Sequence, residues 1–156
     1  MIALKEKLEN KFKKDGNLIL KKIKELTGID WKQEEINVWI MKGWHPSISS
    51  PLLLNYYNYD LDFCFFNLIH ELVHNNLGDF KIRNEKGDYN IIELEAVVNL
   101  ITVFVLKDYF AKDILADLCK RAEFMGMYKY VWKRVKELQE EIDFSKSTIK
   151  KTYGIC

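Results

Sequence analysis

Most of the apolar residues in the chain recur at the spacing of an amphipathic helix. Within residues 1–27 they stand three or four positions apart, which predicts helix. The polar triplet Asp15-Gly16-Asn17 interrupts the pattern and is expected to divide the segment into two helical pieces. Gly28 follows the last apolar residue and is a favourable helix end. The first part of the chain is therefore expected to be helical with one break.

Two short segments have the composition of strands. Residues 36–41 and 52–57 are rich in β-branched, large aliphatic and aromatic residues, and Gly43 follows the first of them. Pro46 and Pro51 bracket the intervening segment, which we expect to be a loop. A small sheet is therefore predicted in an otherwise helical chain.

The second half of the chain is predicted to be helical. A helix capped by Asp60 or Asp62 should end at Gly78, and a second should span residues 91–106 after a polar connector over 79–90. Two more are expected at about 111–124 and 127–142, and residues 143–156 are expected to be a mobile tail. The predicted fold class is α+β, with a small sheet packed on the two central helices and further helices at both ends.

Composition narrows the class of protein. A chain of 156 residues with 48% hydrophobic residues fits a single globular domain. The net charge of +1 gives no reason to expect a nucleic-acid partner. The three cysteines form no CxxC pair, which indicates a reducing compartment. We find no signal-peptide pattern and no apolar run long enough to span a membrane, so a cytoplasmic protein without a membrane partner is expected.

One motif carries candidate chemistry. The helix predicted at 62–77 is apolar nearly all round, which is typical of a buried helix, yet it contains His70, Glu71 and His74. Two histidines four positions apart lie on one helical face, so both imidazoles can reach a single metal ion. Glu71 can reach a water on that ion without binding the ion itself. This is the His-Glu-x-x-His pattern of zinc peptidases.

A catalytic zinc ion usually has three protein ligands and one open position. The next helix offers Glu93 and Glu95, two residues apart and therefore on nearly opposite faces. Glu93 shares its face with apolar residues expected in the core, where an acid calls for a cation. Glu95 shares its face with Asn99 and Thr102, where exposure to solvent would explain it. We therefore expect Glu93 to be the third ligand, with Glu95 as the alternative.

His70-Glu-Leu-Val-His74, followed by a glutamate on the next helix, resembles the gluzincin clan of metallopeptidases. Glu93-Leu-Glu-Ala96 also has the small residue that several gluzincin families carry three positions after the ligand glutamate. The small size fits the minigluzincin or selecase kind, and the segment is more distantly similar to the ImmA/IrrE peptidases. The resemblance covers residues 36–106, which would form the catalytic core. It implies that a strand, 36–41 or 52–57, pairs with extended substrate.

The resemblance implies zinc-dependent hydrolysis of peptide bonds in a peptide or an unfolded protein. Zn²⁺ held by His70, His74 and Glu93 would activate a water, and Glu71 would accept its proton and return it to the leaving amine. One departure favours Glu95. Gluzincins often carry Asp or Asn four residues after the ligand glutamate, and that position is Val97 for Glu93 but Asn99 for Glu95.

Three alternatives stay open. The first is a non-catalytic zinc-binding regulatory protein, in which His45 or Cys156 closes the site as a fourth ligand. The second is a latent enzyme, in which Cys156 or the terminal carboxylate folds back onto the zinc. The third is an ImmA-like regulatory peptidase, although the chain shows no helix-turn-helix signature of a DNA-binding partner domain.

Overall fold

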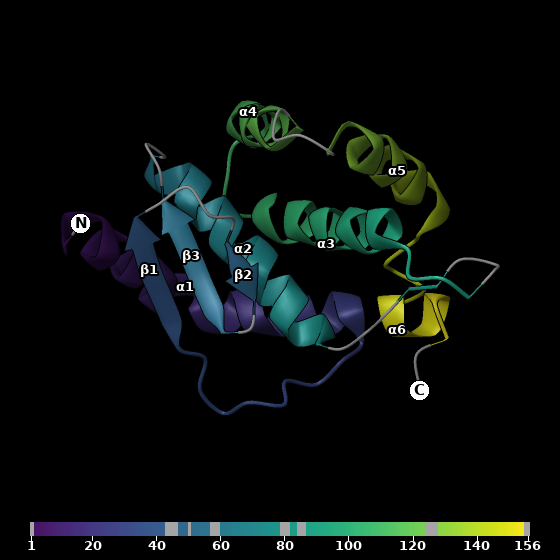
Figure 1. Cartoon of the computed structure of the whole chain (residues 1–156), viewed down its shortest axis with the longest axis horizontal. Helices are drawn as coiled ribbons and strands as arrows, with labels where there is room; N and C mark the ends of the chain where they lie inside the picture. Colours follow the sequence, from purple (N-terminus) through teal and green to yellow (C-terminus); the bar gives the residue numbers. More distant parts are fainter. Residues whose placement is uncertain are drawn as a thin grey trace.

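The computed structural model describes residues 2–42, 47–49, 51–56, 60–78, 82–83, 87–123 and 128–154. Its elements, in chain order, are helix α1, strands β1, β2 and β3, and helices α2 to α6. Their bounds are α1 Ile2–Thr27, β1 Val38–Lys42, β2 Ile48–Ser49, β3 Leu52–Tyr56, α2 Leu61–Leu77, α3 Ile91–Leu106, α4 Lys112–Glu123, α5 Tyr128–Glu141 and α6 Ile149–Thr152 (Figure 1). The described chain is mostly helical with one small sheet, which confirms the predicted α+β class.

The expected break in α1 is wrong, because the helix runs through residues 15–17 without interruption. Gly16 is buried there, and a Cβ atom built on it would lie 2.7 Å from the ring of Phe12. The glycine therefore makes room for an aromatic side chain one turn earlier and does not act as a helix breaker. The predicted end of the helix is confirmed, since Gly28 follows Thr27 with φ of 73°.

The sheet has the strand order β1-β3-β2. β1 pairs with β3 in parallel, from Val38 opposite Leu52 to Lys42 opposite Tyr56, and β2 pairs with β3 antiparallel. The two predicted strands are confirmed within two residues at each end, and Tyr57 lies outside the described residues. β2 is a short strand within the segment predicted to be a loop.

The two central helices have the predicted bounds. α2 begins after Asp60, whose side chain accepts a hydrogen bond from the Phe63 N–H at 2.8 Å, and it ends at Gly78 with φ of 59°. α3 follows the N-cap residue Asn90, which accepts from the Glu93 N–H at 3.1 Å. Both helices are buried over most of their length, as their all-round apolar sequences predict.

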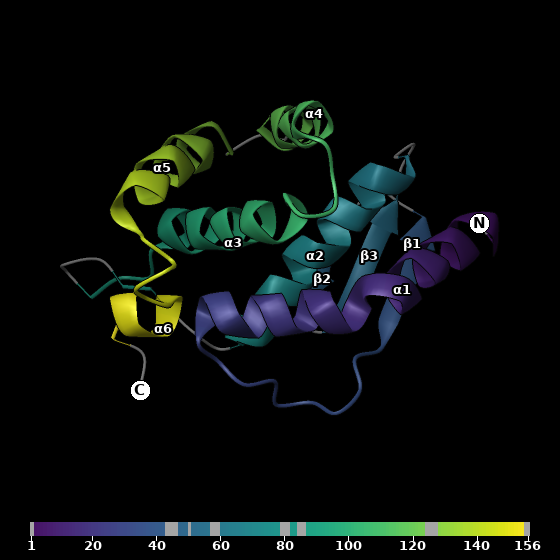
Figure 2. The same ribbon diagram turned by 180° about the vertical axis from the view of Figure 1, so that it is seen from behind.

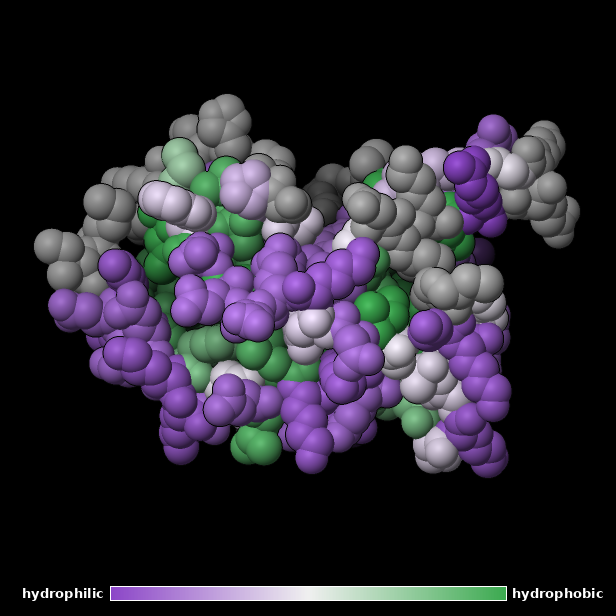
Figure 3. All heavy atoms as spheres, turned by 90° about the horizontal axis from the view of Figure 1, so that it is seen from below, coloured by the Kyte–Doolittle hydropathy of each residue, from purple (hydrophilic) through white to green (hydrophobic). Residues whose placement is uncertain are grey.

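The helices lie in layers around α2 and α3. α1 and the sheet pack against α2, whereas α5 packs against α3 on the side away from α1 (Figures 1 and 2). The lower face of the molecule is largely hydrophilic in Figure 3, where the lysine-rich outer side of α1 meets solvent. No helix within the described ranges has both the length and the hydropathy that crossing a lipid bilayer requires.

Residues 143–154 belong to the segment expected to be a mobile tail. They fold into a turn and α6, in which Ile149 is fully buried and joins the core. α6 contacts α1, and the N-cap residue Thr148 lies beside Gly28. The last two residues, including Cys156, lie outside the described residues, as does His45.

Candidate metal centre

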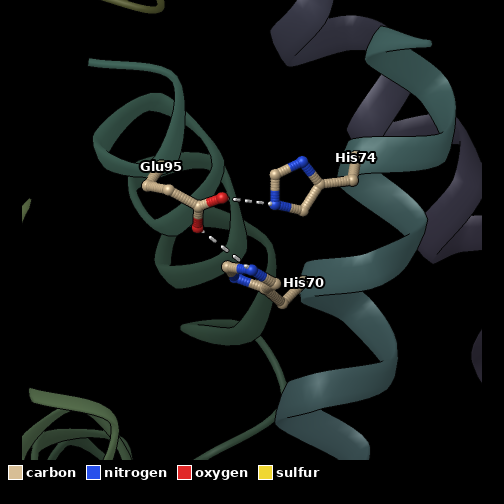
Figure 4. A group of neighbouring side chains, drawn as sticks. All are labelled: His70, His74 and Glu95. Carbon is tan, nitrogen blue, oxygen red and sulfur yellow. Dashed lines mark ion pairs between the residues drawn. The ribbon is translucent and has the colours of Figure 1, made fainter. Parts of the chain in front are cut away.

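The structure brings His70, His74 and Glu95 together between α2 and α3 (Figure 4). Glu95 lies with one carboxylate oxygen 3.3 Å from His74 Nε2 and the other 3.6 Å from His70 Nε2. One potential ligand atom from each residue lies within 4.8 Å of the others. The two imidazole rings meet edge to face, with centroids 4.8 Å apart. These three side chains can therefore converge on a single ion.

The expectation that Glu93 would join the histidines is corrected. Its carboxylate accepts hydrogen bonds from Arg134 Nε and Nη2, at 2.7 and 3.0 Å, and from the Tyr153 hydroxyl at 2.7 Å. Arg134 belongs to α5 and Tyr153 follows α6, so Glu93 faces away from α2. The cation that an acid at this buried position calls for is a guanidinium group. Glu95, the alternative, takes the place beside the histidines.

The polar stripe next to Glu95 is buried, contrary to the expectation of solvent exposure. Asn99 is 1% exposed and Thr102 is 0% exposed. Each bonds to the helix itself: Asn99 Nδ2 donates to the Glu95 carbonyl at 2.8 Å, and the Thr102 hydroxyl donates to the Val98 carbonyl at 2.8 Å. Asn99 also raises the pKa of His70, so its side chain lies close to that imidazole.

Burial and charge shift the ionisation of the group. Burial and, to a smaller extent, the neighbouring His74 lower the pKa of His70 to about 4, although Glu95 and Asn99 act in the opposite direction. Burial alone would raise the pKa of Glu95, but the hydrogen bond and charge of His74 outweigh it, so the carboxylate stays ionised well below neutral pH. A neutral imidazole and an ionised carboxylate are the forms that bind a metal ion.

One oxygen of Glu95 accepts no hydrogen bond from the described residues, although His70 Nε2 lies 3.6 Å from it. Glu95 Oε2 is buried, and no hydrogen-bond donor contacts it among the residues that the structure describes. Leaving a carboxylate oxygen buried and unpaired is costly. A cation placed between the carboxylate and the two imidazoles would supply the missing interaction. The residues present therefore fit a metal ion.

Glu71 lies beside this group and is 7% exposed. Burial raises its pKa to about 7; the nearby His74 opposes the rise and the Glu95 carboxylate adds to it. A carboxyl group that titrates near neutral pH can both accept and return a proton under physiological conditions. The structure therefore places the proposed proton acceptor beside the candidate metal ligands.

Two asparagines fix the end of the helix that carries the histidines. Asn76 is buried, accepts a hydrogen bond from the Thr27 hydroxyl at 2.7 Å and donates to the Ile29 carbonyl at 3.2 Å. Asn75 donates to the Ser49 carbonyl in β2 at 3.1 Å. These bonds tie the last turn of α2 to α1 and to the sheet. The orientation of His74 is thereby supported from two sides.

The sequence reasoning missed Arg134 and Tyr153, the partners of Glu93. The charge pattern of α5 offered a signal, because Arg134 stands three and seven positions before Glu137 and Glu141 and bonds to both. The fourth ligands considered for a closed site, His45 and Cys156, lie outside the described residues. Within those residues, the His70, His74 and Glu95 cluster is the only set of three or more such donors close enough to hold a metal ion.

Comparison of the chain with models of protein families, with curated proteins and with solved structures finds no match in any of the three.

Proposed function

We propose that the protein is a zinc-dependent peptidase that hydrolyses peptide bonds in peptides or unfolded proteins. The observation that carries the proposal is the convergence of His70, His74 and Glu95, with Glu71 buried beside them. Among the described residues, none donates a hydrogen bond to the buried Glu95 Oε2. The order His-Glu-Leu-Val-His along one helix supports a peptidase over a purely structural site.

Two imidazoles and one carboxylate form a donor set typical of catalytic zinc sites. A zinc ion held there would supply Lewis-acid chemistry, polarising a carbonyl group and lowering the pKa of a water bound to it. Each of the three side chains would give the ion one ligand atom. Because structural zinc sites usually have four protein ligands, three ligands would leave a position for water or substrate.

Glu71 would act on protons and not on the metal. Its carboxylate would accept the proton of the attacking water and later donate it to the nitrogen of the leaving amine.

The decisive experiment compares the wild-type protein with Glu71→Gln. We expect both to retain about one zinc ion per chain after gel filtration, measured by elemental analysis. Only the wild type should cleave a fluorescein-labelled denatured protein, and Glu71→Gln should lose at least about a hundredfold in rate. Glu140→Gln, at an exposed position of α5, is the matched control and should behave as the wild type.

Undiminished hydrolysis by Glu71→Gln would overturn the role of that residue. A second outcome would overturn the proposal as a whole. The same donor set suits ferrous iron in oxygen-dependent enzymes. Two results together would therefore assign the site to a different chemistry. The first is that the protein, purified from cells supplied with both metals, contains iron and not zinc. The second is that it hydrolyses no peptide bond.

A further inference from the structure

Apolar side chains are exposed at the start of the helix that carries Glu95. Tyr89, Ile91 and Ile92 are 48%, 40% and 43% exposed, within four consecutive residues. Single exposed apolar residues are ordinary on protein surfaces, and Ile114 on α4 is one, at 42%. A cluster is less ordinary, and clusters commonly mark binding surfaces.

The cluster lies one helical turn from the candidate metal group. Ile91 and Ile92 precede Glu95 by four and three positions, so they share its side of α3. Tyr89 stands just before the N-cap residue, and its pKa is raised by burial and also by the charge of Glu95. The exposed apolar residues and Glu95 therefore lie on the same side of the first turns of α3.

This segment is fixed by main-chain contacts. The Asn90 N–H donates to the Ile82 carbonyl at 2.8 Å, and Arg83 and Tyr89 form an antiparallel bridge. Asn90 also caps α3 through its side chain. The backbone that carries the three side chains is thus fixed before any partner binds, which lowers the entropy cost of binding.

We propose that Tyr89, Ile91 and Ile92 form a subsite that binds an apolar side chain of the polypeptide whose peptide bond lies at His70, His74 and Glu95. The inference rests on the proposed function and adds the class of substrate. One turn of helix spans about 5.4 Å, whereas an extended chain advances about 3.4 Å per residue. The apolar residue is therefore expected one or two positions from the bond that is cleaved.

An unfolded polypeptide fits this surface better than a folded partner. Stable interfaces between folded proteins bury about 800 Å² on each partner. Three partly exposed side chains offer much less than this, but they are sufficient to cover one leucine or phenylalanine side chain. Unfolded proteins expose such side chains throughout their length.

The test measures binding separately from hydrolysis. The protein is zinc-loaded Glu71→Gln, and the probes are two fluorescent hexapeptides that differ only in Leu or Ser at the second position after a central glycine. The Leu peptide is expected to bind about tenfold more tightly, the ratio that burial of roughly half a leucine side chain supports. Adding Ile91→Ser and Ile92→Ser to Glu71→Gln should reduce the ratio of the two peptide affinities to about one. Adding Ile114→Ser, an isoleucine of equal exposure on another helix, should leave it unchanged.

Cleavage products of a denatured protein give the second readout. Wild-type cuts should fall within two residues of apolar side chains, and Ile91→Ser with Ile92→Ser should scatter them while the zinc content stays the same. The subsite is overturned if the two peptides bind with equal affinity. It is also overturned if Ile91→Ser with Ile92→Ser leaves the ratio of the two affinities unchanged. Preferential binding of the Leu peptide without any hydrolysis by the wild type would support the subsite and overturn the proposed peptidase function.

Discussion

At the scale of single residues, two glutamates two positions apart take different partners. Glu93 points to Arg134 and Tyr153, and Glu95 points to His70 and His74. Both carboxylates are largely buried, with side chains 14% and 18% exposed. Each of these acids therefore has a specific reason to be buried, and each should respond differently to substitution.

Zinc retention separates these two roles. Glu95→Ala should weaken zinc binding by more than about a hundredfold, because even the loss of a group that only supports a ligand costs 10–100-fold. Glu93→Ala should retain the metal and instead lose about 1–3 kcal/mol of stability, since it removes the hydrogen bonds that Arg134 and Tyr153 donate to this carboxylate. The measurement is zinc content after dialysis against a weak chelator. Loss of zinc from Glu93→Ala alone would reverse the assignment.

Acid should remove the contribution of the Glu93 carboxylate to the free energy of unfolding. Burial raises the pKa of Glu93, but the hydrogen bonds from Arg134 and Tyr153 outweigh it and hold the pKa below its usual value of 4.5. Between the folded and unfolded pKa values the unfolded chain binds more protons, so stability falls as the pH falls. The contribution is therefore complete above about pH 4.5 and is lost as the pH falls through the folded pKa.

The measurement is urea unfolding of two zinc-free proteins, the wild type and Glu93→Gln, at several pH values. The difference in unfolding free energy between the two proteins should be constant between pH 6 and 8 and should shrink below about pH 4.5. A difference that grows as the pH falls would contradict the ion pair with Arg134. Using zinc-free protein removes the effect of acid on metal binding.

Sequence alone predicted that His70, Glu71 and His74 lie together on one helix with both histidines on one face, because their spacing determines their relative positions. It favoured Glu93 over Glu95 as their neighbour, whereas the structure places Glu95 beside the histidines. The choice depended on which face of α3 meets α2, and an all-round apolar helix carries no such information. The deciding partner, Arg134, lies 41 residues further along the chain. The polar stripe with Asn99 was read as exposed because side chains that bond to their own helix cannot be told from solvated ones by pattern.

At the scale of elements, the predicted helix bounds agree best with the structure where a capping residue marks the end of the helix. Asp60 caps the first turn of α2 and Gly78 caps its last turn, so both ends of this helix are set by residues next to them in the sequence. The break expected in α1 is wrong because Gly16 makes room for the Phe12 ring, and the sequence pattern does not show where that ring lies. α6 was missed because a four-residue helix carries too little periodicity, and its stability comes from the burial of Ile149.

The docking of α6 can be tested at Gly28. A Cβ atom there would lie 2.6 Å from Thr148 Oγ1, and φ of 73° is unfavourable for alanine. Gly87 has a similar φ of 84°, but a Cβ atom built on it meets nothing within 4 Å. Gly87→Ala should therefore cost about 1–2 kcal/mol from backbone strain alone. Gly28→Ala should cost roughly 1–3 kcal/mol more, because overpacking adds to the strain.

Denaturant midpoints of the two variants provide the comparison. Gly28→Ala should also make the end of the chain more accessible to carboxypeptidase, because Thr148 caps α6. Equal losses of stability in the two variants would show that α6 does not pack against the end of α1 in solution.

At the scale of the whole molecule, the candidate metal group joins the two helices on which the other elements pack. His70 and His74 belong to α2, which contacts α1 and the sheet, and Glu95 belongs to α3, which contacts α5. The core is continuous across this boundary. An ion bound between α2 and α3 would therefore stabilise the fold as a unit and not only one helix.

Zinc should accordingly raise the unfolding temperature of the whole protein. At a free zinc concentration a hundred times the Kd, the linkage relation gives about 2.7 kcal/mol, provided that the unfolded chain does not bind the ion. For a chain of this size that corresponds to a rise of roughly 5–10 °C. The measurement is thermal unfolding by circular dichroism, with zinc or with EDTA. Glu95→Ala should show almost no rise, whereas Glu93→Ala should start from a lower temperature and show the full rise. If zinc shifts Glu95→Ala as far as the wild type, the ion binds elsewhere, and the site between α2 and α3 is not the metal centre.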